Sequence, residues 1–204
     1  MTDPIEALER LRAGNARFVA NETSLSRPDV ERTRLASGQT PFAVILGCSD
    51  SRVPTEIVFD QGLGDLFVIR VAGNIVAPSQ IGSIEFAAMK FGTQLVVVLG
   101  HTKCGAVEAT IDELQRPAAK QSRNIAAIVE RIRPSVVELL ESGEPKDHDE
   151  LVDKAVRDNV RYSANALRSG SEIIKELIGS GELLIVGAEY SLDTGVVEFF
   201  DGTP

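Results

Sequence analysis

The chain has 204 residues, of which 43% are hydrophobic and 25% are charged, a composition typical of a globular domain and not of a disordered chain. No apolar run approaches the roughly 20 residues of a membrane-spanning helix, and the N-terminus lacks the basic and apolar regions of a secretory signal. Acidic residues outnumber basic residues by 30 to 21, so the net charge of −9 is opposite to that of most nucleic-acid-binding proteins, and we expect a cytoplasmic protein that binds neither nucleic acid nor membranes.

The first predicted element is a helix over residues 3–20. Asp3 is a suitable N-cap, and the proline that follows it suits the first helical turn. Apolar residues then recur at helical spacing, at Ile5, Leu8 and Leu11. Residues 20–40 are polar and include glycine and proline, so we expect an irregular segment there. The prediction is an N-terminal helical arm over residues 1–40, followed by the main domain over residues 41–204.

Four apolar runs in the main domain are predicted to be buried parallel strands, because a strand covered on both faces is apolar along its whole length. They comprise residues 42–47, 66–71, 94–99 and 183–190. A shorter run over residues 196–200 follows a turn-like sequence. We predict that this last run pairs as an antiparallel edge strand.

Helices are predicted between the strands, and a run of acidic residues is predicted to be a surface connection. The predicted helices cover residues 78–91, 103–114, 123–140, 151–168 and 171–178. Residues 53–59 are compatible with a short helix or a strand. Residues 141–154 hold six acidic residues and two basic residues, together with glycine and proline. Alternating strands and helices predict a single α/β domain with a mostly parallel central β-sheet flanked by helices.

The chain has two cysteines and two histidines, and three of these four residues follow predicted strands. Cys48 comes directly after the first strand, and His101 and Cys104, three residues apart, come after the third. The carboxyl ends of parallel strands gather ligands, and the first and third strands can be neighbours in a doubly wound sheet. Two thiolates and one imidazole suit Zn²⁺. The alternative is two core cysteines and a histidine in a turn.

Asp50 and Arg52 lie two residues apart, just after Cys48. They are compatible with an ordinary solvated ion pair, which contributes little to stability. Next to zinc they predict a different role. A free carboxylate would bind the metal as a fourth ligand, whereas an arginine that holds both of its oxygens would keep it away and leave that position to water.

The combined pattern resembles the β-class carbonic anhydrases of bacteria. Cys48-Ser49-Asp50-Ser51-Arg52 matches C-x-D-x-R, and His101-Thr102-Lys103-Cys104 matches H-x-x-C. The resemblance runs over nearly the whole chain. Its other segments are Gln39-Thr40-Pro41, Arg70-Val71-Ala72-Gly73-Asn74, Gly82-Ser83-Ile84-Glu85, and residues 187–195.

This resemblance implies a zinc lyase that reversibly hydrates CO₂ to bicarbonate and a proton, by attack of zinc-bound hydroxide. Cys48, His101 and Cys104 correspond to the constant zinc ligands. Asp50 corresponds to a conditional fourth ligand, which in some members binds zinc and in others pairs with Arg52. The Asp50–Arg52 dyad is thus expected to control the fourth zinc position.

The resemblance also implies an oligomer, either a homodimer or a homotetramer. The expected substrate pocket includes Gln39, Phe67, Phe86 and Gly105, and it lies near the interface between subunits. The N-terminal helix over residues 3–20 corresponds to an arm that embraces the partner subunit.

Two other functions are compatible with the same zinc ligands. One is hydrolysis of carbon disulfide or carbonyl sulfide on this fold. The other is a zinc-stabilised assembly module without catalytic turnover, in which Asp50 stays bound to zinc. Arg52 favours an enzyme over the module, because a purely structural site has no use for a guanidinium that competes for the fourth ligand.

Overall fold

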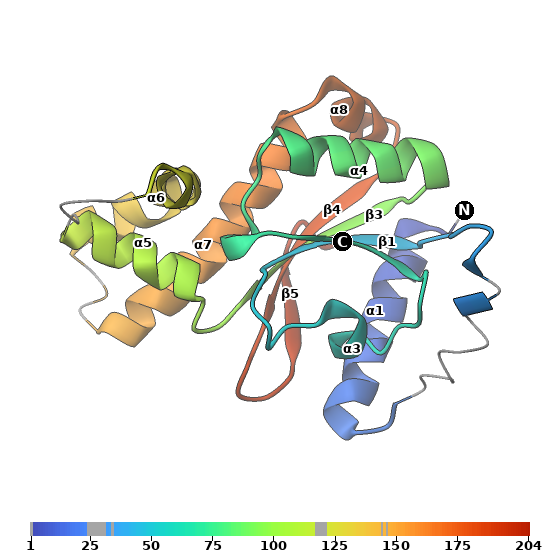
Figure 1. Ribbon diagram of the computed structural model, residues 1–204, viewed down its shortest axis with the longest axis horizontal. Helices are drawn as coiled ribbons and strands as arrows, with labels where there is room; N and C mark the ends of the chain where they lie inside the picture. The colour runs from blue at the N-terminus through green and yellow to red at the C-terminus, as the bar shows by residue number, and fades with distance from the viewer. Residues whose placement is uncertain (1, 24–31, 34, 117–121, 144, 146) are drawn as a thin grey trace.

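The computed structural model describes residues 2–23, 32–33, 35–116, 122–143, 145 and 147–204. Its centre is a five-stranded sheet in the order β2-β1-β3-β4-β5 (Figure 1). The strands are β1 (Ala43–Gly47), β2 (Leu66–Arg70), β3 (Leu95–His101), β4 (Leu184–Tyr190) and β5 (Val197–Asp201). Neighbouring strands pair in parallel, except that β5 runs antiparallel to β4. The predicted α/β fold with an antiparallel edge strand is confirmed.

Helices pack on both faces of this sheet. They are α1 (Pro4–Ala20), α3 (Thr55–Val58), α4 (Pro78–Phe91), α5 (Gly105–Gln115), α6 (Arg123–Ser142), α7 (His148–Ser169) and α8 (Glu172–Gly179). Figure 1 shows α1 and α3 on one side of the sheet, and α4 and α8 on the other. A short 3₁₀ turn, η1 (Ala72–Asn74), follows β2. Among the described residues, no helix combines the length and the apolar character that a membrane crossing requires.

The central strands are buried along their whole length, as their continuous apolar sequences predict. Every residue of β1 and of β3 is buried. The prediction that β2 is equally buried is wrong. Only Leu66 is buried, and Arg70 is exposed. The reason is position, because β2 lies at the edge of the sheet and has a strand on one side only.

Helix α1 packs against its own chain. The Asp3 carboxylate accepts hydrogen bonds from the amides of Ile5 and Glu6, which confirms the predicted N-cap. Further along, the Asn15 side chain donates to the carbonyls of Val58 and Gly195, and its oxygen accepts from an amide of β5. The helix is therefore fixed to α3 and to the β4–β5 turn. Contact of this arm with a partner subunit stays a prediction.

The start of α7 differs from the prediction, and a segment left open by the sequence takes a defined form. Helix α7 begins at His148 and not at residue 151, because Asp147 caps it by accepting a hydrogen bond from the Glu150 amide at 3.0 Å. The expected surface connection is correspondingly short. Residues 53–59, compatible with either element, contain the short helix α3. The expected irregular segment over residues 20–40 lies partly outside the described residues.

Candidate metal centre

The Cys48, His101 and Cys104 side chains converge at one end of the sheet. Pairing of β1 with β3 places Gly47 opposite Leu99, so Cys48 leaves β1 beside the end of β3 that carries His101. The two thiol sulfurs and a ring nitrogen of His101 all lie within 4.8 Å of one another. The three residues are only 5%, 1% and 1% exposed. The predicted convergence of the two sequence segments is therefore present in the structure.

One ring nitrogen of His101 forms a hydrogen bond, and the other has no partner among the described residues. Its Nδ1 lies 2.9 Å from the carbonyl oxygen of Thr102, and since a carbonyl only accepts, Nδ1 carries the proton. Nε2 is buried and has no hydrogen-bond partner among the described residues. A backbone hydrogen bond of this kind fixes the tautomer of metal-binding histidines in general. The unprotonated Nε2 is therefore available as a metal ligand.

The pKa values of the two thiols move in opposite directions. The Cys104 thiol donates to the Cys48 sulfur, and this hydrogen bond, with smaller contributions from His101 and from the amide of Gly73, lowers the pKa of Cys48 to about 4 despite burial. The thiolate of Cys48 and burial in turn raise the pKa of Cys104. A divalent cation between the two sulfurs would balance the charge of two thiolates. The donor set therefore fits Zn²⁺.

The turn from β3 into α5 sets the spacing of His101 and Cys104. Lys103 adopts a left-handed conformation, with φ of 55°, so the chain reverses between the two donor residues. The Lys103 ammonium pairs with Asp193 at 2.8 Å. Cys104 is the N-cap of α5, and its carbonyl accepts from the amide of Val107. Gly105, the first residue of α5, is exposed and has open space where a side chain would begin.

Asp50 and Arg52 form a forked ion pair at the edge of the Cys48, His101 and Cys104 group. Arg52 Nε donates to Asp50 Oδ1 at 2.9 Å, and an Arg52 terminal nitrogen donates to Oδ2 at 2.7 Å. This contact holds the pKa of the Asp50 carboxyl well below its usual range. Asp50 Oδ2 also lies 3.8 Å from His101 Nε2. The ionised carboxylate of Asp50 therefore lies close enough to His101 Nε2 to reach the same metal ion after a small movement.

Two contacts at the site lay outside the predictions from sequence. Arg70, at the end of β2, donates to the carbonyls of Cys48 and Asp50 at 2.9 and 2.5 Å, and so fixes the loop that carries both residues. The amide of Gly73 donates to the Cys48 sulfur at 3.3 Å. The only signal was their presence in the segment Arg70-Val71-Ala72-Gly73-Asn74, which no spacing rule connects to Cys48.

The other expected pocket residues are Gln39, Phe67 and Phe86. Gln39 is exposed. Phe67 and Phe86 lie near each other, with ring centroids 6.3 Å apart, and Phe91 completes an aromatic cluster between β2 and α4. Phe67 packs on the apolar cluster beneath α4, whereas Cys48 and Cys104 belong to another cluster under α5 and α6. A pocket role for these residues stays a prediction.

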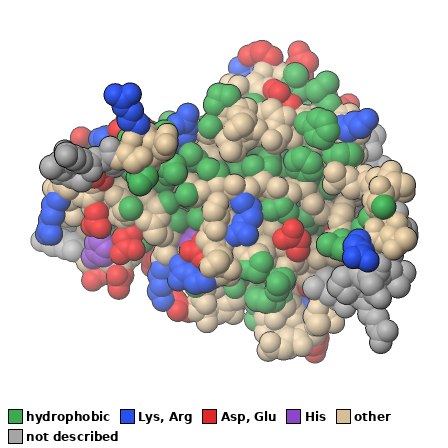
Figure 2. Space-filling model, in the orientation of Figure 1, with side chains coloured by type: hydrophobic (Ala, Val, Ile, Leu, Met, Phe, Trp, Pro, Cys, Tyr) green, Lys and Arg blue, Asp and Glu red, His purple; other side chains and the backbone are tan. Residues whose placement is uncertain are grey.

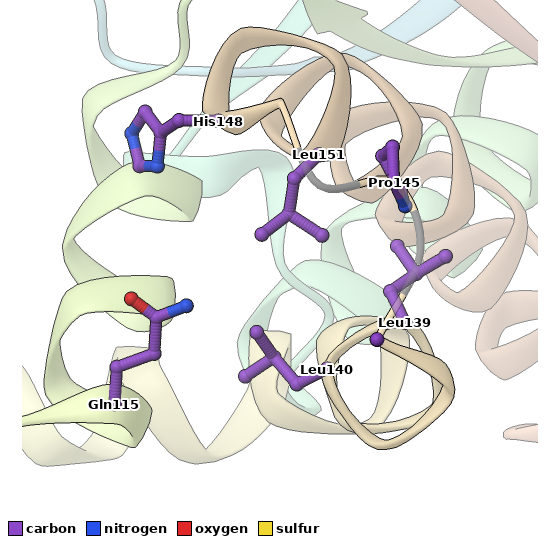
Figure 3. A pocket seen from close by; sticks show the side chains of 7 residues that line it. Gln115, Leu139, Leu140, Pro145, His148 and Leu151 are labelled. Atoms are coloured by element: carbon purple, nitrogen blue, oxygen red, sulfur yellow. The ribbon is translucent and has the colours of Figure 1, made fainter.

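A separate pocket of about 210 Å³ lies between α5, α6 and α7 (Figure 3). Its lining includes the leucines Leu139, Leu140 and Leu151, together with Gln115 and His148. The His148 side chain is half-exposed, and its Nε2 lies 3.8 Å from a carboxylate oxygen of Glu108. The second histidine of the chain is therefore a surface residue that takes no part in the Cys48, His101 and Cys104 group.

Comparison with known proteins identifies the family. Residues 43–197 match the carbonic anhydrase family. Carbonic anhydrase 2 of Mycobacterium tuberculosis is 41% identical over 195 residues, which are 95% of this chain and 91% of that protein. A β-carbonic anhydrase of Aspergillus fumigatus superposes with a TM-score of 0.75 at 27% identity, covering 97% of this chain and 90% of that chain. The chain belongs to the β-carbonic anhydrase family.

This β-carbonic anhydrase is also similar to two further proteins. The carbonic anhydrase of Mycolicibacterium smegmatis is 39% identical over 198 residues, covering 97% of this chain and 93% of the relative. A tetrameric β-carbonic anhydrase from Sordaria macrospora has the same fold, with a TM-score of 0.74 at 24% identity over 83% of this chain and 85% of that one. Family membership makes the chain a lyase that hydrates CO₂, and the predicted activity is confirmed.

Proposed function

We propose that this carbonic anhydrase hydrates CO₂ at a zinc ion held by Cys48, His101 and Cys104, with Asp50 and Arg52 controlling the fourth position. The observation that carries the proposal is the fork of Arg52 on Asp50 beside three converging donor atoms. With three protein ligands and the adjacent Asp50 carboxylate held by an arginine, one position is left for water. Catalytic zinc sites have this arrangement, whereas structural sites take four protein ligands.

Zinc, when bound, supplies acidity, because it lowers the pKa of a water molecule at its open position toward neutrality. The protein side chains orient the water molecule and keep the fourth metal position open. Asp50 stays ionised beside Arg52, so its Oδ2 would be able to accept a hydrogen bond from a water molecule at the zinc and orient that water toward CO₂. Arg52 prevents the same carboxylate from becoming a ligand. Arg70 holds the backbone of both Cys48 and Asp50, so the donor sulfur and the orienting carboxylate keep their relative position.

The proposal includes a homodimer or homotetramer with the substrate pocket near the subunit interface. The support is a surface on α4 and β2 that is apolar yet uncovered. Phe86 is 52% exposed and Met89 is 70% exposed, and Figure 2 shows hydrophobic side chains gathered over α4. Large exposed apolar patches mark interaction sites. In that assembly, Gln39, Phe67, Phe86 and Gly105 would line pockets completed by a neighbouring subunit.

X-ray absorption at the zinc edge, on protein whose mass in solution is measured by light scattering, tests this proposal. We expect one zinc per chain, two sulfur neighbours and two lighter neighbours, in particles of two or four times 21.9 kDa. Four sulfur neighbours, or lighter neighbours alone, would contradict the ligand set. A particle of a single chain would contradict the interface pocket.

A further inference from the structure

The thiolate of Cys48 receives a backbone hydrogen bond from a turn that is distant in sequence. The Gly73 amide, in η1, donates to Cys48 Sγ at 3.3 Å, and both atoms are buried. Such hydrogen bonds orient metal-binding groups and tune their electron density. The strength of the bond depends on how firmly Gly73 is held. Gly73 adopts a left-handed conformation with φ of 69°. Because glycine can adopt many backbone conformations, other contacts must hold it in this one.

The side chain that holds Gly73 is Asn159 of α7. Its Nδ2 donates to the carbonyl of Gly73 at 2.8 Å, and the asparagine is 1% exposed. Gly73 is therefore bonded on both sides, to Cys48 through its amide and to Asn159 through its carbonyl. Two buried hydrogen bonds therefore connect α7 to the metal-binding group, one from Asn159 to Gly73 and one from Gly73 to Cys48.

Helix α7 is itself firmly placed against the strand that carries His101. A side-chain carbon on Gly100, the residue before His101, would come within 2.5 Å of Val160 and 3.3 Å of Val156. These two valines flank Asn159 on the buried face of the helix. Such close packing resists a shift of α7 along the strand. The position of the Asn159 side chain relative to Gly73 is therefore set by the packing of α7 on β3.

Space filling alone does not account for an amide at position 159. The Oδ1 atom of Asn159 is buried and has no hydrogen-bond partner among the described residues. A buried polar atom without a partner lowers stability, whereas a leucine, whose side chain has the same number and branching of heavy atoms, would avoid that cost. The amide nitrogen contributes one interaction that leucine lacks, which is the hydrogen bond to Gly73.

We propose that Asn159 is a positioning residue of the metal centre, which holds Gly73 so that the Gly73 amide donates to Cys48 and strengthens metal binding. This inference rests on the proposed metal site at Cys48, His101 and Cys104. Without Asn159, Gly73 turns away, the Cys48 thiolate loses its donor, and its negative charge is less dispersed. Cys48 Sγ is then less well oriented toward the other two ligands, so the metal is held less firmly, while the thiolate without its hydrogen bond is more electron-rich.

The test compares Asn159→Leu with the matched control Asn15→Leu. Asn15 is also a buried asparagine that donates to backbone carbonyls, on α1 and not at η1. Zinc affinity is measured by competition with a chromophoric chelator, and the cobalt-loaded forms are compared by their sulfur-to-metal charge-transfer absorption. We expect Asn159→Leu to raise the zinc dissociation constant about 10- to 100-fold and to move the charge-transfer band to longer wavelength. Asn15→Leu should lower the melting temperature and leave both metal readouts unchanged.

Unchanged zinc affinity and an unchanged charge-transfer band in folded Asn159→Leu would overturn the inference. A measurement on the wild-type protein covers the case in which the variant does not fold. Loaded with a spin-active cadmium isotope, the wild type should show scalar coupling between the metal and the amide proton of Gly73, and the absence of coupling would overturn the inference. A wild-type protein that binds no zinc would instead contradict the proposed metal site, so the two failures are distinguishable.

Discussion

Replacement of Arg52 with alanine is expected to lower kcat/KM for CO₂ hydration at least about 100-fold, while zinc content stays at one per chain. The reason is the position of Asp50, whose Oδ2 lies 3.8 Å from His101 Nε2 and is held there by Arg52. Once released, the carboxylate binds the metal and occupies the position that water needs. The loss is of the size found when a single electrostatic group is removed from an active site.

Stopped-flow CO₂ hydration and metal analysis on the same sample measure this effect. Arg161→Ala is the matched control, because Arg161 also pairs with a nearby aspartate, at 2.8 Å from Asp158, on the exposed surface of α7. It should keep the wild-type rate. Cobalt-loaded Arg52→Ala should also fail to change its absorption when thiocyanate is added, since the open position is filled. Wild-type hydration by Arg52→Ala would remove the role given to the dyad.

His101→Ala is expected to abolish stable zinc binding and, with it, nearly all CO₂ hydration. Nε2 is the only nitrogen donor of the three converging groups, and two thiolates with Asp50 do not replace it in geometry or in charge. A ligand that binds only the folded state stabilises that state. Added zinc should therefore raise the melting temperature of the wild type and leave that of the metal-free His101→Ala protein unchanged.

The second histidine provides the control for this substitution. His148 is a half-exposed residue beside Glu108, and it takes no part in the metal-binding group. His148→Ala should keep zinc content, thermal stabilisation by zinc, and the hydration rate. If His148→Ala lost zinc as His101→Ala does, or if His101→Ala kept it, the assignment of the ligands would be wrong.

The local parts of the site were predictable from sequence because they depend on short spacings. Asp50 and Arg52 are two residues apart, so a forked ion pair can form between them within one loop, which Arg70 and the Lys103 carbonyl also hold in place. His101 and Cys104 share one strand-to-helix turn. Only the meeting of these two segments needed the fold. The sequence allowed the first and third strands to be neighbours, and the structure shows that β1 and β3 pair.

The supporting contacts were not predictable in this way. Gly73 reaches Cys48 across 25 residues of sequence, and Asn159 reaches Gly73 across 86. No periodicity or motif encodes a hydrogen bond whose geometry is set by how α7 packs on β3. The start of α7 was a different kind of miss. Asp147 is a suitable N-cap, but the surrounding acidic residues favoured a solvated connection over a helix.

The zinc requirement is tested most directly by the CO₂ hydration rate of the wild-type enzyme before chelation, after chelation, and after zinc is restored. We expect activity with one zinc per chain, loss of activity with the metal, and recovery on addition of zinc. An assay of sulfide release from carbon disulfide or carbonyl sulfide on the same sample should stay negative. Full hydration activity in the zinc-free protein, or sulfide release without hydration at full zinc content, would contradict the account.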